Sequence, residues 1–140
     1  MREIEIRGYA VEELVGDQWV YGTGVHTTKF TKEFAEEVGK PGETFIFTES
    51  GWIEVYPESV GEYTGLKDKN SKVIYEGDVV KVEIPVVSVN EDFIGQVKMF
   101  EGRWWVDNGH DAIPLWSEVN EIAVLGNIYE NPELLGGADE

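Results

Sequence analysis

Residues 62–83, EYTGLKDKNSKVIYEGDVVKVE, decide how this 140-residue chain is interpreted. The segment carries four lysines, although the whole chain has 28 acidic and 11 basic residues and a formal net charge of −17. A polar loop at 67–72 leads into an apolar run at 73–75, and Val80, Val82 and Ile84 then alternate with other residues. This pattern predicts a turn between β-strands, with the lysines on a solvated loop. These lysines are Lys67, Lys69, Lys72 and Lys81.

Two ligand-binding interpretations of the segment fail on residue identity. A calcium loop counted from Asp68 would need an oxygen ligand at its fifth position, where Lys72 stands. It would also need a glycine where Val73 stands and a glutamate where Val79 stands. A phosphate loop would need a glycine-rich run ending in Gly-Lys-Ser or Gly-Lys-Thr, which is absent. We therefore expect Asp68, Glu62 and Glu76 to pair with the lysines and reduce local repulsion.

The composition favours an all-β chain. It contains 16 glycines together with five Trp, six Tyr and six Phe, and such residues suit turns and pleated surfaces. The sequence predicts small barrel-like or rolled antiparallel sheets, mainly β with one short helix. We expect a single domain over residues 1–140, which can contain an N-terminal β sub-region at 1–57 and a barrel-like sub-region at 61–135.

Alternating segments and turn residues give the expected elements. Ile4 and Ile6 begin an opening hairpin that returns through residues 19–21. A short helix follows Thr31 and ends at Gly39. TFIFT and WIEVY flank a glycine turn at 49–51, and Trp52 and Trp116 are predicted to be core residues. The remaining predicted strands are 78–84, 93–100, 103–107 and 121–129.

Charge and residue usage restrict the classes of function. The sequence pI is near 4.3 and both halves are acidic, which disfavours direct binding to nucleic acid. Cysteine is absent and only two histidines are present, so we predict no disulfide, no metal site and no cofactor. No apolar run is long enough to span a bilayer. We therefore expect a cytoplasmic protein without a membrane segment.

One loop carries residues that can do chemistry. The segment DNGHDAIP places Asp107, His110 and Asp111 close together in the sequence. A histidine between carboxylates can act as a general base or bind a metal, which would support a hydrolase. The alternative is a glycine-containing loop between strands. Because no nucleophile and no second histidine lie nearby, we assign no catalytic residue.

Two pairs of apolar residues are candidates for contact with another protein. Neighbours in a strand point to opposite faces, so only one of Trp104 and Trp105 can enter the core easily. The other, with Arg103, would form a recognition surface. In the tail, Leu134 and Leu135 lie in a single predicted helical turn, with Pro132 at its first position. They either pack back on their own domain or pair with another subunit.

Two segments resemble a known family. VGEYTGLKDKNSKVIYEGDVVKVE and EIAVLGNIYENPELL are similar to the YopX protein family of phages and prophages of low-GC Gram-positive bacteria. The resemblance implies an all-β fold with barrel-like parts, a bacterial host cell and no catalytic residue. The residues that carry it are Tyr63, Thr64, Gly65, Leu66, Asp68, Tyr75, Glu76, Gly77, Asp78, Gly126, Asn127, Tyr129, Asn131 and Pro132.

The sequence departs from the family pattern at two places. The family usually has Asn-Gly where Asn70-Ser71 stands, and the aromatic and acidic residues usual after the first strand are not evident in GYAVEE. At the positions that match, turn formers and core residues dominate, so the resemblance supplies structure and origin and no reaction.

Three hypotheses for function follow. The first is a non-catalytic interaction module of a phage or prophage, binding a protein partner or a second copy of itself. The second is an acidic mimic of nucleic acid that binds a host DNA-binding protein through its carboxylates. The third is a hydrolase that uses Asp107, His110 or Asp111.

Overall fold

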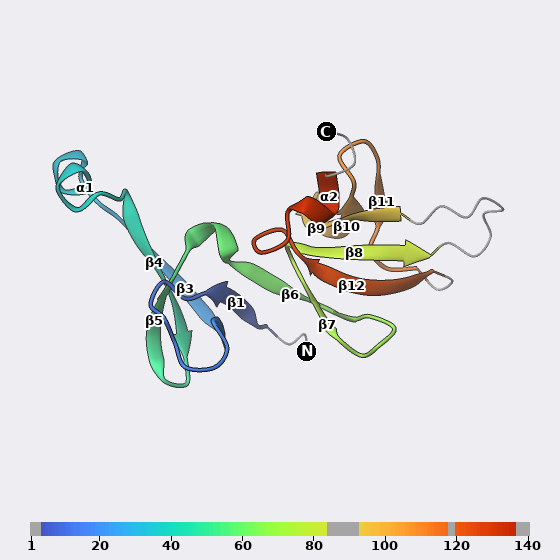
Figure 1. Ribbon diagram of the computed structural model, residues 1–140, viewed down its shortest axis with the longest axis horizontal. Coiled ribbons are helices and arrows are strands. Elements are labelled where there is room, and N and C mark those ends of the chain that lie inside the picture. Colours follow the sequence, from blue (N-terminus) through green and yellow to red (C-terminus); the bar gives the residue numbers. More distant parts are fainter. Residues whose placement is uncertain (1–3, 84–92, 118–119, 137–140) are drawn as a thin grey trace. The chain divides into compact units, whose positions relative to one another are not determined.

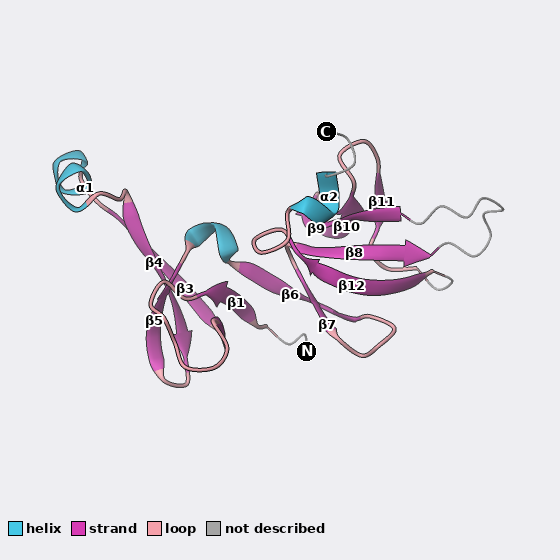
Figure 2. Cartoon of the chain, in the orientation of Figure 1, coloured by secondary structure: helices cyan, strands magenta, loops and turns pink. Residues whose placement is uncertain are grey.

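The chain folds into antiparallel β-sheets with little helix, as Figures 1 and 2 show. A computed structural model describes residues 4–83, 93–117 and 120–136. The chain divides into two compact units, Met1–Glu62 and Tyr63–Glu140, and it passes from one to the other within a single strand. The all-β fold predicted from composition and alternation is confirmed. Among the described residues, no helix has the length and apolar character needed to cross a membrane.

The described part of unit 1 contains five whole strands, the start of a sixth, one short α-helix and one 3₁₀ turn. The predicted opening hairpin is present, with Tyr9 opposite Trp19, and Gln18 closes its loop by hydrogen bonding Leu14 N–H, Ala10 O and Glu12 O. The elements are β1 (Ile6–Tyr9), β2 (Trp19–Gly22), β3 (Gly24–Lys29), α1 (Lys32–Val38), β4 (Gly42–Thr48), β5 (Gly51–Val55), η1 (Pro57–Ser59) and the start of β6 (Gly61–Lys67).

The core of unit 1 is small. It is centred on four buried side chains, with Ile6, Leu14, Ile53 and Val60 packed around them. Alternation decides which residues enter it, because Ile46 lies between Phe45 and Phe47 on β4 and faces inward. The four central residues are Ala10, Val20, Ile46 and Val55.

The segment from β3 to β4 forms an arm with α1 at its tip (Figure 1). As predicted, the helix begins after Thr31, whose hydroxyl accepts the Phe34 N–H at 3.2 Å, and ends at Gly39, which has φ = +88°. No residue of α1 is buried. A helix of this length normally depends on packing against the rest of the protein for its stability. The helix α1 has no such packing, because none of its residues is buried.

Unit 2 contains a five-stranded sheet in the order β11-β10-β9-β8-β12. The later part of β6 pairs with β7 beside it. Buried Ile74, Val80, Val97 and Leu115 belong to its core, against which Trp104 packs. The elements are β7 (Val73–Tyr75), β8 (Asp78–Glu83), β9 (Phe93–Phe100), β10 (Arg103–Asp107), β11 (Ala112–Pro114), β12 (Glu121–Asn127) and α2 (Glu133–Gly136).

The predicted strands 78–84 and 121–129 correspond to β8 and β12, although Ile84 lies outside the described residues. The prediction that Trp52 and Trp116 are core residues was wrong, because their side chains are 55% and 61% exposed. In both cases a neighbour takes the inward position. Leu115 is only 2% exposed and fills the core of unit 2, so Trp116 turns outward.

Candidate interaction surfaces

The lysine-bearing loop is held by a buried carboxylate. Asp68 is 8% exposed, and its Oδ1 accepts the N–H groups of Asn70 and Lys72, each at 2.8 Å. Its Oδ2 accepts the Val124 N–H at 2.9 Å, across 56 residues of sequence. Burial raises the pKa of Asp68, but the bonds from Val124, Lys72 and Asn70 together with the Lys72 charge lower that pKa below its ordinary value.

This carboxylate joins the two segments that carry the family resemblance. A second bond, from Lys69 N–H to Ile122 O at 2.9 Å, fixes the loop to β12 beside it. The loop is therefore a clamp between residues 67–72 and β12 and not an open ligand site. Asp68 was expected to pair with lysine side chains, whereas its three hydrogen bonds all come from the backbone. Lys69 and Lys81 instead reach Glu83, at 3.6 and 3.8 Å.

The other residues of the first segment shape turns and fill the core. Thr64 is buried and its hydroxyl donates to Ile74 O at 2.8 Å, while Leu66 packs against the core. Gly65 has φ = +90° at an irregular step in the β6–β7 pairing. The rings of Tyr63 and Tyr75 lie 5.9 Å apart, on residues paired across β6 and β7.

The turn at 75–78 is also held by a buried aspartate that accepts a backbone N–H. Asp78 is 2% exposed and its Oδ2 accepts the Tyr75 N–H at 2.8 Å, with Glu76 and Gly77 (φ = +91°) between them. Gly77 donates to Val97 O and accepts from Ile128 N–H, so this turn is hydrogen-bonded to β9 and to the segment after β12. These contacts are structural.

The second segment ends in a tight turn. Asn131 Oδ1 accepts the Asn127 N–H at 3.2 Å, and Asn127 Oδ1 accepts the Glu130 N–H at 2.7 Å, with half-buried Tyr129 between them. Pro132 immediately precedes α2, and its carbonyl accepts the Leu135 N–H at 3.2 Å. A Cβ on Gly126 would come within 2.9 Å of Leu134 Cδ1.

The short distance from Gly126 shows that the Leu134 side chain lies against β12. This side chain packs back over β12 of its own unit, and Leu135 is half-buried beside it in the sequence. Of the two alternatives predicted for this leucine pair, the geometry describes packing back. Pairing of these leucines with another subunit stays a prediction.

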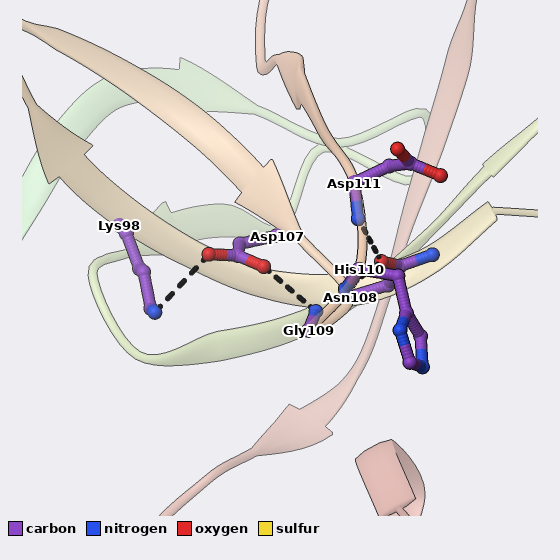
Figure 3. Close-up of polar contacts among 6 residues, drawn as sticks. All are labelled: Lys98, Asp107, Asn108, Gly109, His110 and Asp111. Carbon is purple, nitrogen blue, oxygen red and sulfur yellow. Dashed lines mark hydrogen bonds and ion pairs between the residues drawn. The ribbon is translucent and has the colours of Figure 1, made fainter.

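The loop containing Asp107, His110 and Asp111 forms a compact turn (Figure 3). Asp107 accepts the Gly109 N–H at 2.7 Å and lies 3.2 Å from Lys98 Nζ, while Asn108 accepts the N–H groups of His110 and Asp111. Figure 3 shows the His110 ring pointing away from both carboxylates. Among the described residues, no cluster of three or more His, Cys, Asp or Glu is arranged for a metal ion.

The surroundings of Asp107 do not favour this carboxylate as a general base. The Gly109 N–H, followed by the Lys98 ammonium, lowers the pKa of Asp107 below its ordinary value against a smaller effect of burial. A carboxylate with a lowered pKa is a weaker proton acceptor. The Asp107 and Asn108 side chains thus close a polar turn between β10 and β11, and a hydrolase that uses this loop stays a hypothesis.

The two neighbouring tryptophans of β10 do face opposite sides. Trp104 packs against the core of unit 2. Trp105 is half-buried on the other face, where its indole N–H donates to Phe100 O at 2.9 Å and Arg103 lies over its ring at 5.0 Å. Phe100 is 62% exposed beside them. Arg103, Trp105 and Phe100 form a small surface that we call the hairpin patch.

A larger aromatic surface lies in unit 1 and was missed from the sequence. His26, Phe45, Phe47 and Trp52 share the outer face of the β3-β4-β5 sheet, because the register places them opposite one another in pairs. The Trp52 ring is 5.1 Å from Phe47 and 6.2 Å from His26. We call this surface the aromatic sheet face.

The aromatic sheet face could have been predicted from the alternation of residues in WIEVY, because every second residue of a strand lies on the same face. Trp52 and Glu54 share one face, while Ile53 and Val55 share the other, and a glutamate marks the solvent side. Similarly, Phe45 and Phe47 lie on the same face of β4 as Glu43, because these residues are two positions apart.

Two further features belong to the arm and its base. At the tip, Phe34 and Val38 are 46% and 44% exposed, and Phe34 contacts the Phe30 ring at 4.8 Å. At the base, a groove of about 680 Å³ is lined by Trp19, Phe47 and neighbouring residues. The full lining is Ile4, Glu5, Trp19, Val20, Tyr21, Gly22, Thr23, Phe47, Thr48, Glu49, Ser50 and Ile53.

Comparison with known proteins gives a family and a fold. The family model described as YopX protein matches residues 17–136. The structure is similar to that of protein yopX from Bacillus subtilis, with a TM-score of 0.54 and 20% identity over 98% of each chain. It also matches protein EF1440 from Enterococcus faecalis, with a TM-score of 0.48 and 20% identity over 96% of this chain and 99% of that one. A search of curated proteins finds no match. At 20% identity, the similarity to the yopX structure shows that the two proteins share a fold and nothing more.

Proposed function

The chain belongs to the YopX protein family, and from that premise we propose a phage- or prophage-encoded, non-catalytic protein-interaction module that acts in the bacterial cytoplasm. Its binding surface is the aromatic sheet face. The observation that carries the proposal is the exposure of Trp52 and Phe47, 55% and 48%, on neighbouring strands whose rings touch. Large adjoining aromatic side chains in water are typical of surfaces that become buried on binding.

The charges around this surface indicate the chemistry of the partner. Glu54 lies directly opposite Phe45, and Glu43 lies on the same face of β4. Lys40 reaches Glu54 at 2.9 Å and Glu43 at 3.0 Å, and these bonds, first from Glu54 and then from Glu43, raise the pKa of Lys40. A cation is therefore already held at the border of the aromatic sheet face.

A basic partner fits both the exposed aromatic rings and the glutamates beside them. Arginine side chains can stack on Trp52 while neighbouring cations approach the glutamates. The net charge of −17 would increase the rate of encounter with such a partner. The partner class is thus a protein with a basic surface that presents arginine or lysine beside apolar side chains.

A matched pair of tryptophan variants tests the proposal. We expect tagged protein to capture its partner from a host lysate, Trp52→Ala to lose it, and Trp116→Ala to retain it. The control is apt because Trp116 is equally exposed, at 61%, and lies in unit 2. Loss of binding in both variants, or in neither, would contradict a site at the aromatic sheet face. Arg103→Ala tests the hairpin patch in the same assay.

Nucleic-acid mimicry is the second candidate, favoured by acidity that is spread over both halves of the chain. It predicts a DNA-binding partner whose capture is prevented by added DNA. Rows of uninterrupted carboxylates are what mimicry needs, whereas ion pairs at Glu83 and Asp107 break the pattern in unit 2. Retention of the partner in excess DNA would favour the interaction module, and competition by DNA would favour mimicry.

A further inference from the structure

The three-stranded sheet of unit 1 has one covered edge and one open edge. At the β5 edge, Val11 N–H donates to Glu54 O at 3.0 Å and Tyr56 N–H donates to Tyr9 O at 3.0 Å. At the opposite edge, β3 pairs with β4 alone among the described strands. Five of the six residues of β3 are exposed. Exposed edges are templates for another strand.

The register shows which backbone groups face the open side. Phe30 N–H donates to Pro41 O at 2.9 Å, which continues the β3–β4 ladder one step beyond Lys29 and Gly42. Because hydrogen-bonded and non-hydrogen-bonded pairs alternate in an antiparallel ladder, His26 and Thr28 also bond to β4. The N–H and C=O groups of Val25, Thr27 and Lys29 therefore point outward.

The charge of this edge differs from that of the rest of the chain. Residues 18–32 contain no aspartate or glutamate, and they form the longest acid-free stretch of the sequence. The stretch includes β3 and carries Lys29 and Lys32. Two copies of this acidic protein repel one another overall. They can approach each other at β3, because residues 18–32 carry no carboxylate that would add to this repulsion.

We propose that β3 pairs in antiparallel fashion with β3 of a second copy of this chain. With Thr27 opposite Thr27 of the second copy, all three outward-facing residues find partners, and Lys29 lies opposite Val25 instead of another lysine. The arrangement is a two-fold interface in which both copies use the same surface. It joins two three-stranded sheets into one sheet of six strands.

The same register brings the arm tip to a second site. Phe30 falls opposite Gly24 of the second copy, so α1 continues past Thr23 and Gly22 of that copy. Those two residues line the groove at the base of the arm. The exposed Phe34 and Val38 of α1 enter this groove beside Trp19 and Phe47. The pairing thus covers a helix that has no buried residue in the single chain.

The oligomeric state of three purified proteins tests the proposal. We expect the natural chain to sediment as a dimer, and Thr27→Pro to sediment as a monomer, because proline removes an outward N–H and leaves the β3–β4 ladder intact. Thr27→Val retains the N–H and serves as the control that stays dimeric. Circular dichroism reports whether each variant is folded.

A second variant keeps the proposal testable if Thr27→Pro fails to fold. Phe34→Ser leaves the edge untouched and removes an apolar contact, so we expect its dimer to dissociate at least tenfold more easily. Added salt should strengthen the natural dimer, since it screens repulsion between acidic copies. A monomeric natural chain, or Phe34→Ser with unchanged affinity, would overturn the proposal. Phe47 belongs both to the groove at the base of the arm and to the aromatic sheet face, so capture of a partner through Trp52 is measured with the monomeric Thr27→Pro variant, where it can succeed or fail independently of the dimer.

Discussion

Ser71 occupies a backbone conformation that suits glycine, since its φ is +68°. It sits in the lysine-bearing loop, where its N–H donates to Asp68 O at 2.9 Å. The family resemblance leads us to expect glycine at this position, and the serine that stands there adopts the left-handed backbone conformation that glycine favours. A side chain in the left-handed region carries strain of roughly 1–3 kcal/mol. The loop keeps this conformation because the Asp68 carboxylate bonds hold the residues around it.

Replacing this serine by glycine should therefore stabilise the protein. We expect Ser71→Gly to raise the free energy of unfolding by roughly 1 kcal/mol, since relief of strain exceeds the entropy that glycine adds to the unfolded chain. Urea denaturation followed by tryptophan fluorescence measures the change. Ser71→Ala is the control, because it removes the hydroxyl and keeps the strained φ. Equal stability of the glycine and alanine variants would contradict the explanation.

Individual residues predicted the positions of turns better than they predicted which side chains are buried. Thr31, Gly39 and Gly51 mark their turns by local chemistry, and each was placed correctly. Burial of Trp52 and Trp116 was predicted from hydrophobicity alone and was wrong. Whether a tryptophan is covered depends on which strand face it occupies and on what packs there, and only the parity of neighbouring residues carries part of that information.

The clamp between residues 67–72 and β12 depends on one ionised group, the Asp68 carboxylate. Asp68 is stabilised as a carboxylate, and its pKa is below the ordinary value of 3.8. A lowered pKa in the folded state adds stability above pH 3.8 and loses it as the pH falls through the folded-state pKa. The clamp should therefore be intact at neutral pH and weaken only in acid.

The variant Asp68→Ala measures this contribution. It leaves the N–H groups of Asn70, Lys72 and Val124 without their acceptor, so we expect a loss of roughly 2–4 kcal/mol of stability at pH 7. The loss should shrink as the pH falls below 3.8, because the natural chain then loses the same bonds. Chemical denaturation across that pH range provides the measurement. A difference that stays constant into acid would show that ionisation of Asp68 is not what matters.

The elements themselves were largely predictable, and their contacts were not. The lysine-bearing loop was identified as a turn, yet nothing local indicated that Asp68 would bond to Val124, since 56 residues separate them. Likewise α1 was expected from its caps, whereas its exposure at the end of the arm follows from the absence of covering strands there among the described residues. Local chemistry fixes where an element starts and stops, and long-range pairing decides what it touches.

The amino-acid sequence specifies the net charge of the chain but not how the charges are arranged. The sequence fixes 28 acidic side chains, but only the structure shows which of them surround the aromatic sheet face and which pair with lysines. Repulsion among so many like charges opposes compaction. The exposed ion pairs at Glu83 and Asp107 offset it only weakly, at about 0–1 kcal/mol each.

Sodium chloride should therefore stabilise the folded chain at pH 7. Screening reduces the mutual repulsion of a chain with net charge −17 by more than it weakens the few lysine pairs, because the Debye length falls from about 30 Å at 0.01 M to about 3 Å at 1 M. Melting temperature against salt, measured in the Thr27→Pro variant, excludes any contribution from association. Near the sequence pI of about 4.3 the net charge vanishes, and the salt effect should vanish with it. Destabilisation by salt at pH 7 would contradict this prediction. It would mean that the ion pairs stabilise the folded chain by more than the repulsion among its carboxylates destabilises it.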